Sequence, residues 1–460
     1  MPEGVLVVIA VDLVVRAAYV LTMTEGASPL RGGAIAVDAG RVVRVGTAQS
    51  IDAQYLAKRT VDVGNAVVLP GFVDVHAHVS QTFLRGRQNG VFGAGPFLPF
   101  LVTDLLTDDR VRLFGLAGCL EALRYGTTTI QASLTSMPAL AEAVELCGIR
   151  AVLAEEVCDM SYEDAAYGRY VHRPGQADVQ LDRARLLVED WHRSASGRII
   201  AAVAPLAPDM VLPGTYRQIA RFAHEYGVMV ATHAAQSKFE MQRVAEIQGT
   251  TPIRYLSDLG TLGDMTLLAH CLYATAEDVA IVAEAGAAVA HSPRGFLLDG
   301  VVAPLSDWLS SGIRVGLGTD DVTHSMWETL RAARYAAAVR GDRSITPYQM
   351  LELATLGGAA ALGLSGEVGA IAPDLKADLQ VVGCDGPEMT PMSDVAGSLV
   401  ENGGANVNMV FVDGKIVFGP GRETKIDIPR SLDDVREENG RLWLDIAAKF
   451  GPELSIDQSR

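Results

Sequence analysis

Eight short apolar segments alternate with helix-like stretches through the middle of the chain, and this alternation restricts the fold more than any other feature. Strands of a parallel sheet that is covered on both faces are continuous hydrophobic runs, and eight of them separated by helices are typical of a (β/α)₈ barrel. The segments are 67–78, 126–133, 149–157, 199–207, 228–236, 265–273, 287–293 and 315–321. Between them, amphipathic runs at 109–124, 137–147, 216–226 and 276–285 predict helices.

A doubly wound open sheet is the competing architecture. No GxGxxG loop and no GxxxxGKS or GxxxxGKT loop follows any of the eight segments, so the phosphate-binding signature of such sheets is absent. Strand-like segments also occur near both chain ends, at 34–37, 41–46, 377–382 and 407–418, with a hairpin turn at Asp413-Gly414. The two β segments that flank the middle indicate one small domain.

Composition excludes several classes of partner. With 49% hydrophobic and 20% charged residues the chain is typical of a soluble enzyme, and a net charge of -17 without any basic run argues against nucleic acid. The five cysteines are scattered and form no CxxC pair, which indicates reduced thiols. The apolar run 5–15 is interrupted by Asp12, so it predicts a buried strand rather than a membrane span or a signal peptide. We therefore expect a cytoplasmic protein with no membrane partner.

Two histidines one residue apart, His76 and His78, end the first segment. Alternate residues of a strand point to the same face, so both imidazoles can reach one ion. The alternative is a polar strand end at which the two histidines form hydrogen bonds only with nearby groups or with solvent. However, the carboxyl ends of all the strands in such a barrel meet at one mouth, and those ends carry His76, His78, His233, His270, His291 and Asp320. Five of the nine histidines thus end a predicted strand, which packing does not readily explain.

Imidazoles and one carboxylate are the ligands that a borderline-soft divalent ion prefers, and a catalytic site keeps one position open for water. We expect His76, His78, His233 and Asp320 to be the ligands. Asp320 would also take a proton from the activated water and pass it to the leaving group. His270 would polarise the substrate oxygen or steady the nucleophile.

Motifs spread over nearly the whole chain belong together: LPGFVDVHAH, GCLEALRYGTTT, THAAQS, LLAHCLYA, AHSP, GLGTDD, ATLGGAAALGL and KADLQVV. In their order and spacing they resemble the amidohydrolase superfamily, in the branch of triazine hydrolases, chlorohydrolases and S-adenosylhomocysteine or guanine deaminases. The resemblance implies an α/β fold, a (β/α)₈ TIM-type barrel with a small β-sandwich built from both chain ends. The expected domains are 1–66 and 373–428 for the two parts of the sandwich, 67–372 for the barrel and 429–460 for a helical tail.

The same resemblance implies the ligand set given above, with His270 beside the nucleophile. It also implies a divalent ion, most often zinc, with iron, manganese and cobalt as alternatives. The fourth strand has no lysine that could bridge two ions, so we expect a single ion. Homo-oligomers are usual in the superfamily, and we expect one here.

Two departures from the branch bear on the reaction. Its ring deaminases carry H-x-x-E after the fifth strand, where the glutamate moves a proton to a ring nitrogen; this chain has Gln236, and an amide cannot do so. Where deaminases commonly have a substrate-facing histidine after the fourth strand, this chain has Leu206. We therefore predict a hydrolase that cleaves a C–N bond of amide, urea or carbamate type, with a role in degrading foreign compounds.

Two other functions stay open. An aminohydrolase, deaminase or dehalogenating hydrolase acting on an N-heteroaromatic ring would need Asp321 or Glu240 as the missing acid. A barrel without catalysis, kept as an assembly or binding protein, is the third possibility, and the presence of all four presumed ligands argues against it.

A loop rich in Gly, Pro and Phe follows the first strand and contains Phe92, Phe97 and Phe100. Such a loop would lie over the barrel mouth, where these rings could form an apolar wall or simply pack the loop down. If they form a wall, an N-substituted or aromatic small molecule is the natural substrate. We expect Gln236, His291 and Phe92 to contact it.

Overall fold

The computed structural model describes residues 8–86, 97–320 and 322–451, and two eight-stranded sheets organise them. The first sheet is parallel throughout and forms the barrel, in the strand order β13-β12-β11-β10-β9-β8-β7-β6. Its strands are β6 (Phe72–Ala77), β7 (Thr127–Leu134), β8 (Arg150–Val157), β9 (Ile199–Pro205), β10 (Met229–Ala234), β11 (Thr266–His270), β12 (Ala288–His291) and β13 (Arg314–Leu317). All eight predicted strand segments are thereby confirmed.

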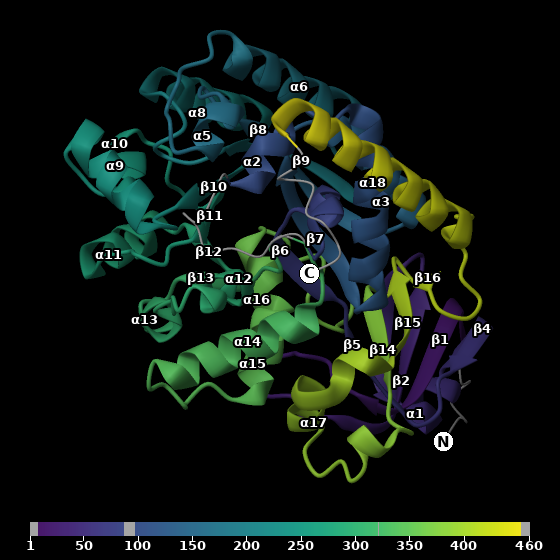
Figure 1. Cartoon of the computed structure of the whole chain (residues 1–460). Coiled ribbons are helices and arrows are strands. Elements are labelled where there is room, and N and C mark those ends of the chain that lie inside the picture. The colour runs from purple at the N-terminus through teal and green to yellow at the C-terminus, as the bar shows by residue number, and fades with distance from the viewer. Residues whose placement is uncertain (1–7, 87–96, 321, 452–460) are drawn as a thin grey trace.

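Helices surround this barrel (Figure 1). Those between its strands are α2 (Leu98–Thr103), α3 (Asp108–Arg124), α4 (Met137–Cys147), α5 (Tyr162–Ala166), α6 (Gln176–Trp191), α7 (Ser194–Gly197), α8 (Pro213–Tyr226), α9 (Lys238–Gln248), α10 (Pro252–Asp258), α11 (Ala276–Ala285), α12 (Pro293–Leu298) and α13 (Leu305–Ser310), with the 3-10 turn η1 (Val79–Leu84) after β6. After β13 follow α14 (Met326–Val339), α15 (Pro347–Leu353) and α16 (Leu356–Ala361). The four predicted helices are all present, two of them with unchanged bounds.

The barrel interior is filled by small and branched side chains that alternate along each strand. Val73 and Val75 of β6 share one buried cluster with Ala202 and Ala204 of β9. Residues of α16 belong to the same cluster, and the N–H of Val73 donates to the carbonyl of Ala354 just before that helix. Helix α16 therefore packs against the amino ends of the strands, which leaves the opposite end of the barrel for the site.

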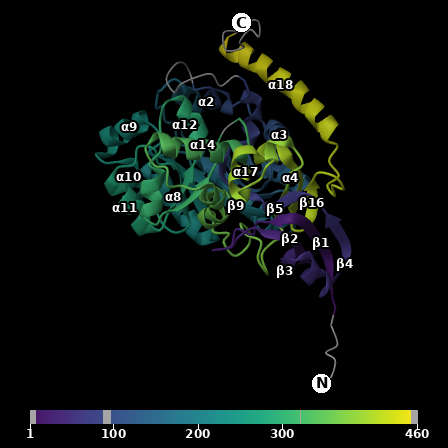
Figure 2. The same cartoon turned by 90° about the horizontal axis from the view of Figure 1, so that it is seen from below.

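The second sheet combines both ends of the chain, in the order β16-β15-β14-β5-β1-β2-β3, with β4 paired to β1. Its strands are β1 (Ile9–Val20), β2 (Leu30–Asp38), β3 (Arg41–Thr47), β4 (Tyr55–Asp62), β5 (Ala66–Pro70), β14 (Leu379–Gly383), β15 (Val407–Val412) and β16 (Lys415–Phe418). They lie together on one flank of the barrel in both views (Figure 1, Figure 2). The short helix α1 (Ala48–Asp52) joins β3 to β4, and η2 (Pro387–Met389), α17 (Val395–Asn402) and η3 (Gly403–Asn406) join β14 to β15. This is the predicted small domain from both ends.

One predicted strand is divided between the two sheets. The segment 67–78 forms β5, which pairs antiparallel with β14 in the small domain, and β6, which opens the barrel. The chain changes sheets at Gly71, where a Cβ would come within 2.1 Å of the Thr128 side chain. The predicted hairpin at Asp413-Gly414 is confirmed, since both residues have positive φ, 48° and 72°, as a type I′ turn requires.

A buried ion pair ties the two sheets together. Arg150, at the start of β8, donates to Asp378 over 3.0 and 3.2 Å and to Asp413 over 2.7 Å. Both aspartates belong to the small domain, so a charge within the barrel wall is neutralised by the other sheet. Burial alone would disfavour these charges, and only the pairing makes them tolerable.

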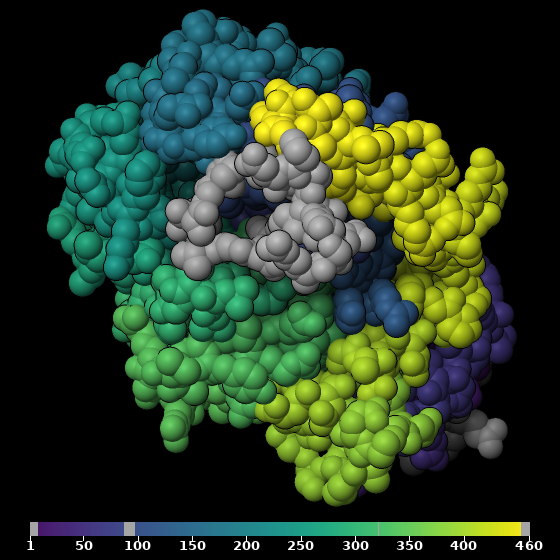
Figure 3. All heavy atoms as spheres, viewed as in Figure 1, coloured from purple at the N-terminus to yellow at the C-terminus, as the bar shows by residue number. Residues whose placement is uncertain are grey.

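The predicted helical tail is α18 (Ile428–Phe450). It lies on the molecular surface as the last described element (Figure 3). It packs against α3, and its buried side chains include Leu442 and Ile446. Arg110 of α3 pairs with Glu438 and Asp445 of this helix. None of the helices in the ranges given above combines the length and the apolar character needed to cross a bilayer.

Candidate metal centre

A register shift in β6 sets the direction of its two histidines. Between Asp74 and Ala77 this strand advances three residues while its neighbour β7 advances two, so β6 holds one extra residue. Val73 and Val75 fill the barrel interior by ordinary alternation. Beyond them the extra residue lets His76 and His78 come together, with ring centroids 4.8 Å apart.

Five of the residues predicted from the sequence meet at the mouth of the barrel. The His76 ring centroid lies 5.0 Å from that of His233 and 5.1 Å from that of His270. One oxygen of Asp320 lies 3.5 Å from Nε2 of both His76 and His78, and the other lies 4.0 Å from Nε2 of His270. Two overlapping groups, His76–His233–His270 and His76–His78–Asp320, each have their possible ligand atoms within 4.8 Å of one another. The cluster can therefore hold a metal ion.

Two of the histidine rings are also oriented by hydrogen bonds so that they can bind such an ion. Nδ1 of His78 lies 2.7 Å from the carbonyl of Ser133, and Nδ1 of His233 lies 2.7 Å from the carbonyl of Leu206. A ring N–H must donate at Nδ1 in both cases, which leaves the lone pair at Nε2. This is how metal-binding histidines are normally oriented by the surrounding protein.

The electrostatics favour neutral imidazoles. Burial, reinforced by the neighbouring rings of His76 and His78, lowers the pKa of His233 to about 3. Burial and the same two neighbours, together with His233, also hold the pKa of His270 well below its usual range. Neutral histidine is the form that binds metals. Burial raises the pKa of the Asp320 carboxyl, while His78 and His233 oppose that shift.

The backbone of the segment that carries Asp320 has two unusual features, a glycine with no room for a side chain and a positive φ at the aspartate. A Cβ on Gly318 would lie 2.8 Å from both the Cβ of His76 and the Oγ of Ser292, so only glycine allows this approach. Asp320 itself has a φ of 65°, which is uncommon for a residue other than glycine and is often found at functional sites.

Asp74 is a buried residue of this site that we did not single out from the sequence. Its carboxylate accepts the hydroxyl of Thr319 over 2.6 Å, the N–H of Thr319 over 3.0 Å and the N–H of His76 over 3.3 Å. Burial raises its pKa to about 7. Asp74 thereby fixes the residue before Asp320 relative to His76. The signal available in the sequence was an acidic residue inside an otherwise apolar strand.

Gln236 follows β10, three residues after His233, on a loop that Glu240 holds in place. The two oxygens of Glu240 accept the N–H groups of Ala235 and Gln236, over 3.0 and 2.8 Å. Glu240 was one of two acids that a ring deaminase could have used, and its carboxylate is instead committed to the backbone. The other, Asp321, lies outside the described residues.

The other residues predicted to contact the substrate or to line its pocket lie in different surroundings. His291 is buried, and its ring packs edge-on against Trp308 of α13 at 5.6 Å, while it also helps to lower the pKa of His270 in the cluster. Phe97 and Phe100 pack edge-on at 4.8 Å, and Phe100 also contacts Tyr162, so these two rings serve at least to hold α2 against α5. Phe92 lies outside the described residues.

Glu156 is a second residue that the sequence analysis missed. It lies near the end of β8, is only 4% exposed, and lines a cavity together with His76, His233 and Ser133. Its carboxylate accepts the hydroxyl of Tyr162 over 2.7 Å. Two consecutive glutamates at the end of a predicted buried strand were the available signal.

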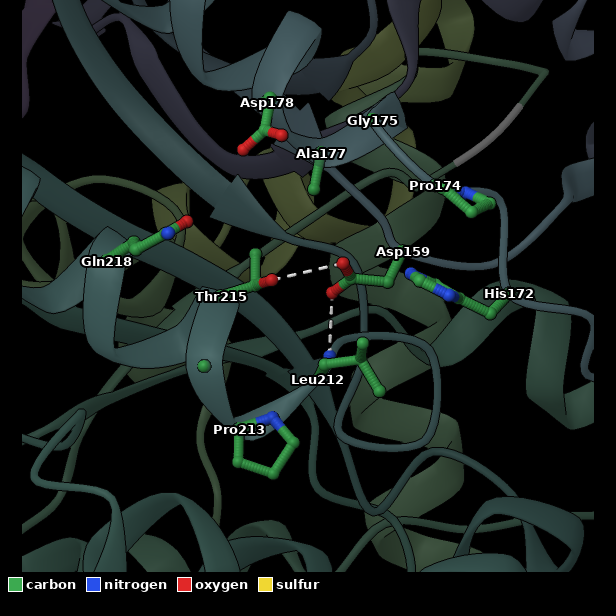
Figure 4. A pocket seen from close by; sticks show the side chains of 11 residues that line it. Asp159, His172, Pro174, Gly175, Ala177, Asp178, Leu212, Pro213, Thr215 and Gln218 are labelled. Carbon is green, nitrogen blue, oxygen red and sulfur yellow. Dashed lines mark hydrogen bonds between the residues drawn. The ribbon is translucent and has the colours of Figure 1, made fainter.

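A separate pocket of about 500 Å³ lies between the starts of α6 and α8 (Figure 4). Asp159 points into this region, and its carboxylate accepts the N–H of Leu212 over 2.7 Å and the hydroxyl of Thr215 over 3.0 Å (Figure 4). His172 lies beside it (Figure 4). None of the residues of the histidine cluster lines this pocket, and Asp159 is engaged in fixing the start of α8.

In this (β/α)₈ barrel the carboxyl ends of the strands bring four histidines and one aspartate together. This combination is typical of metal-dependent hydrolases. The chain belongs to the amidohydrolase family, whose model matches residues 67–417. It is a hydrolase of carbon–nitrogen bonds other than peptide bonds, as the predicted function stated.

Similar proteins cover almost the full length of the chain. A 5-methylthioadenosine/S-adenosylhomocysteine deaminase of Moorella thermoacetica is 32% identical over 421 residues, which are 88% of this chain and 94% of that protein. A 5'-deoxyadenosine deaminase of Methanosarcina mazei is 28% identical over 93% of this chain and 97% of its own. Among solved structures, an adenosine deaminase of Xanthomonas campestris with bound zinc has a TM-score of 0.86 at 24% identity and covers 95% of this chain and 99% of its own. An atrazine chlorohydrolase of Arthrobacter aurescens TC1 complexed with zinc has a TM-score of 0.81 at 22% identity, with 93% and 100% covered. The two structural likenesses support the fold.

Proposed function

We propose that the protein is a mononuclear zinc hydrolase that cleaves the C–N bond of a small amide, urea or carbamate. His76, His78, His233 and Asp320 would hold the ion. An ion held there would supply Lewis acidity, the property that makes water a nucleophile at neutral pH. The absence of any lysine from β9 supports a single ion, because no carbamylated lysine can bridge a pair.

The protein's own residues would then direct the proton. Asp320 accepts a proton from the attacking water and returns it to the departing nitrogen. His270 is 2% exposed, and its low pKa supports a neutral imidazole that can donate a hydrogen bond to the substrate oxygen. The water oxygen ends on the carbonyl carbon, and the amine leaves with one proton taken from that water.

The observation that carries this choice of substrate is the amide of Gln236 on a loop whose nearby carboxylate, Glu240, is already bound to the backbone. A carbonyl substrate needs no protonation of a ring nitrogen, so an amide at this position is sufficient to hold it.

Hydrolytic removal of an amino group or halogen from an N-heteroaromatic ring is a second candidate. Two observations favour it. Relatives about 30% identical over most of the chain bear the names of adenosine-type deaminases, and the buried carboxyl group of Glu156 lines the cavity beside His76 and His233. In this reaction Glu156 would stand in for the missing glutamate.

The experiment that separates the two compares amine release from both substrate classes. Primary amides, ureas and carbamates with a free amino group would be tested with adenosine derivatives, guanine and amino- or chloro-s-triazines, on enzyme loaded in turn with zinc, iron, manganese and cobalt. We expect the carbonyl compounds to be hydrolysed. Hydrolysis of the ring compounds alone would establish the second function instead.

A single substitution tests the part assigned to Gln236. Gln236→Glu restores the acid of the ring deaminases, and we expect it to leave the rate on carbonyl substrates no higher than in the wild type. Gln242→Glu, at an exposed position of α9, is the matched control. A large gain in Gln236→Glu alone would argue for ring chemistry.

Several finer properties belong to the same proposal. The five buried free cysteines support a reducing, cytoplasmic location. A homo-oligomer, a role in degrading foreign compounds, and substrate contacts from Gln236, His291 and Phe92 remain predictions. The four domain ranges also remain predictions, although β5, which they place almost entirely in the barrel, pairs with strands of the small domain.

A further inference from the structure

Glu156 is an acidic side chain that follows two apolar ones on the inward face of β8. Inward-facing residues of β8 alternate, and Val152 and Ala154 both belong to the cluster that fills the barrel. Glu156 is next in this alternation and therefore points to the same interior. A carboxyl group at such a place is costly unless each of its oxygens has a partner.

One oxygen of Glu156 has such a partner. Tyr162 of α5 donates its hydroxyl proton to Oε1 over 2.7 Å, and Gln180 of α6 donates to the Tyr162 oxygen over 3.0 Å. Gln180 is in turn fixed by the N–H of Cys158, 2.8 Å away. This chain of hydrogen bonds sets the orientation of the carboxyl group. Within the described part of the chain, Oε2 takes part in no hydrogen bond.

The space beside Glu156 is small. The cavity that it lines with His76, His233 and Ser133 has a volume of about 10 Å³, which is room for about one water molecule. Its other walls are apolar or short side chains, among them Leu206, Ala204 and Ala231. An unsubstituted amino group has the size of a water molecule, whereas an N-alkyl or N-aryl group is larger.

We propose that Glu156 is a further substrate-binding residue, and that the cavity beside it receives an unsubstituted amino group bonded to the scissile carbon. The carboxyl oxygen Oε2 accepts a hydrogen bond from that amino group. Glu156 thereby selects primary amides, unsubstituted ureas or ring amines, and the released product is ammonia.

This inference rests on the proposed C–N hydrolysis and narrows its leaving group. In the reaction a carbon–oxygen bond forms with water and the carbon–nitrogen bond breaks. The nitrogen leaves as ammonia after taking one proton from that water, and the hydroxyl remains on the carbon. The selection of ammonia as the product holds for a carbonyl carbon and for a ring carbon alike.

Matched substrates that differ by one methyl group test the proposal on the zinc-loaded enzyme. Benzamide would be compared with N-methylbenzamide, and adenosine with N6-methyladenosine, by measuring ammonia and methylamine release. We expect kcat/KM to favour the unsubstituted member of the hydrolysed pair at least about tenfold, the usual effect of one extra methyl group in a closed pocket.

Two variants connect this preference to the cavity. In Glu156→Gln the amide oxygen stays on the Tyr162 hydroxyl, so the NH2 group faces the cavity and cannot accept from the substrate. The variant should lower kcat/KM for the unsubstituted member by about 10- to 100-fold and should reduce the discrimination within the pair. Leu206→Ala widens the cavity and should raise the relative rate on the N-methyl member. Zinc content and Tm are measured for each, and Glu163→Gln, at the neighbouring partly exposed position in α5, should change nothing.

The possible results separate the two levels of the proposal. Equal rates on both members of a pair, or unchanged discrimination in Glu156→Gln and Leu206→Ala, would overturn the assignment of Glu156 and leave C–N hydrolysis intact. If Glu156→Gln does not fold, Leu206→Ala alone decides. If none of these compounds, nor the ureas, carbamates and triazines, is hydrolysed with any of the four metals, the proposed function fails and the assignment of Glu156 fails with it.

Discussion

The main chains of His76 and Asp320 are joined by a hydrogen bond of 2.8 Å, in which the Asp320 N–H donates to the His76 carbonyl. The N–H of His78 donates in turn to the carbonyl of Asp320 over 3.0 Å. These two bonds close the barrel between its first strand and the segment after its last one. The seam of the barrel therefore consists of residues whose side chains would bind the proposed ion, and metal binding would then be linked to barrel closure.

Removal of one ligand should empty the site. We expect one divalent ion per wild-type chain and loss of most of it in His233→Ala, as measured by metal analysis after dialysis. Because the ion binds only the folded protein, a free metal concentration one hundred times Kd should stabilise the wild type by about 2.7 kcal/mol. His224→Ala, at an exposed position of α8, is the control. Two ions per chain would contradict the single-metal site.

Asp74 should affect metal affinity although it is not one of the proposed ligands. Asp74→Asn replaces one oxygen that accepts from Thr319 by a donor, so the residue before Asp320 loses part of its anchor. We expect metal affinity to fall by about 10- to 100-fold, as for other residues that orient metal ligands, measured by competition with a chelator. Asp38→Asn, exposed in β2, should have no effect, and unchanged affinity in Asp74→Asn would mean that the ligands are positioned without it.

The ion pair between the two sheets should be essential to stability. Arg150→Met leaves the buried carboxylate of Asp378 without its cation, whereas Asp413 keeps an ion pair with Lys376 over 3.5 Å. Removal of one member of a buried pair typically costs about 3–5 kcal/mol. Thermal unfolding of the metal-loaded enzyme would measure it. Arg185→Met removes an exposed pair with Asp182 and should change stability by less than about 0.5 kcal/mol. A comparable loss in both variants would exclude a special role for Arg150.

Glu155 should make stability depend on pH. Burial raises its pKa to about 8, although the N–H groups of Met137 and Ser136 bond to its carboxylate and act in the opposite direction. The folded protein then binds more protons than the unfolded chain between the ordinary glutamate pKa of 4.5 and about 8, so this group's contribution to the free energy of unfolding decreases as pH rises through that window. Glu155→Gln removes this contribution. The Tm of the variant should therefore improve relative to the wild type between pH 5 and 8, and a constant difference would show that Glu155 is ionised throughout.

The barrel could be predicted from the sequence because its strands are buried on both faces and stand out as apolar runs. The five residues of the metal cluster followed from the same pattern, since each ends or follows such a run. The division of segment 67–78 could not be predicted, because β5 and β6 are equally apolar and only pairing assigns them to different sheets.

The direction of individual side chains was the second feature that the sequence could not predict. A register shift in β6 turns His76 toward the cluster, and no residue type in that strand announces the shift. His291 ends a strand like the other histidines, and its ring packs on Trp308 while it also helps to lower the pKa of His270, a double set of neighbours that the sequence could not predict. Asp74 and Glu156 lie within strands, where a sequence pattern gives no partner for a buried acid.

The pairing of β5 with β14 has a consequence for synthesis of the chain. Leu69 pairs with Gln380, so the whole barrel lies between the two partners in sequence. At the usual rate of translation, the roughly 300 intervening residues take about 15–60 s to emerge. Throughout that interval β5 presents an open strand edge that can pair with another chain. Newly made molecules should therefore depend on chaperones longest for their N-terminal strands, even when the barrel has already folded.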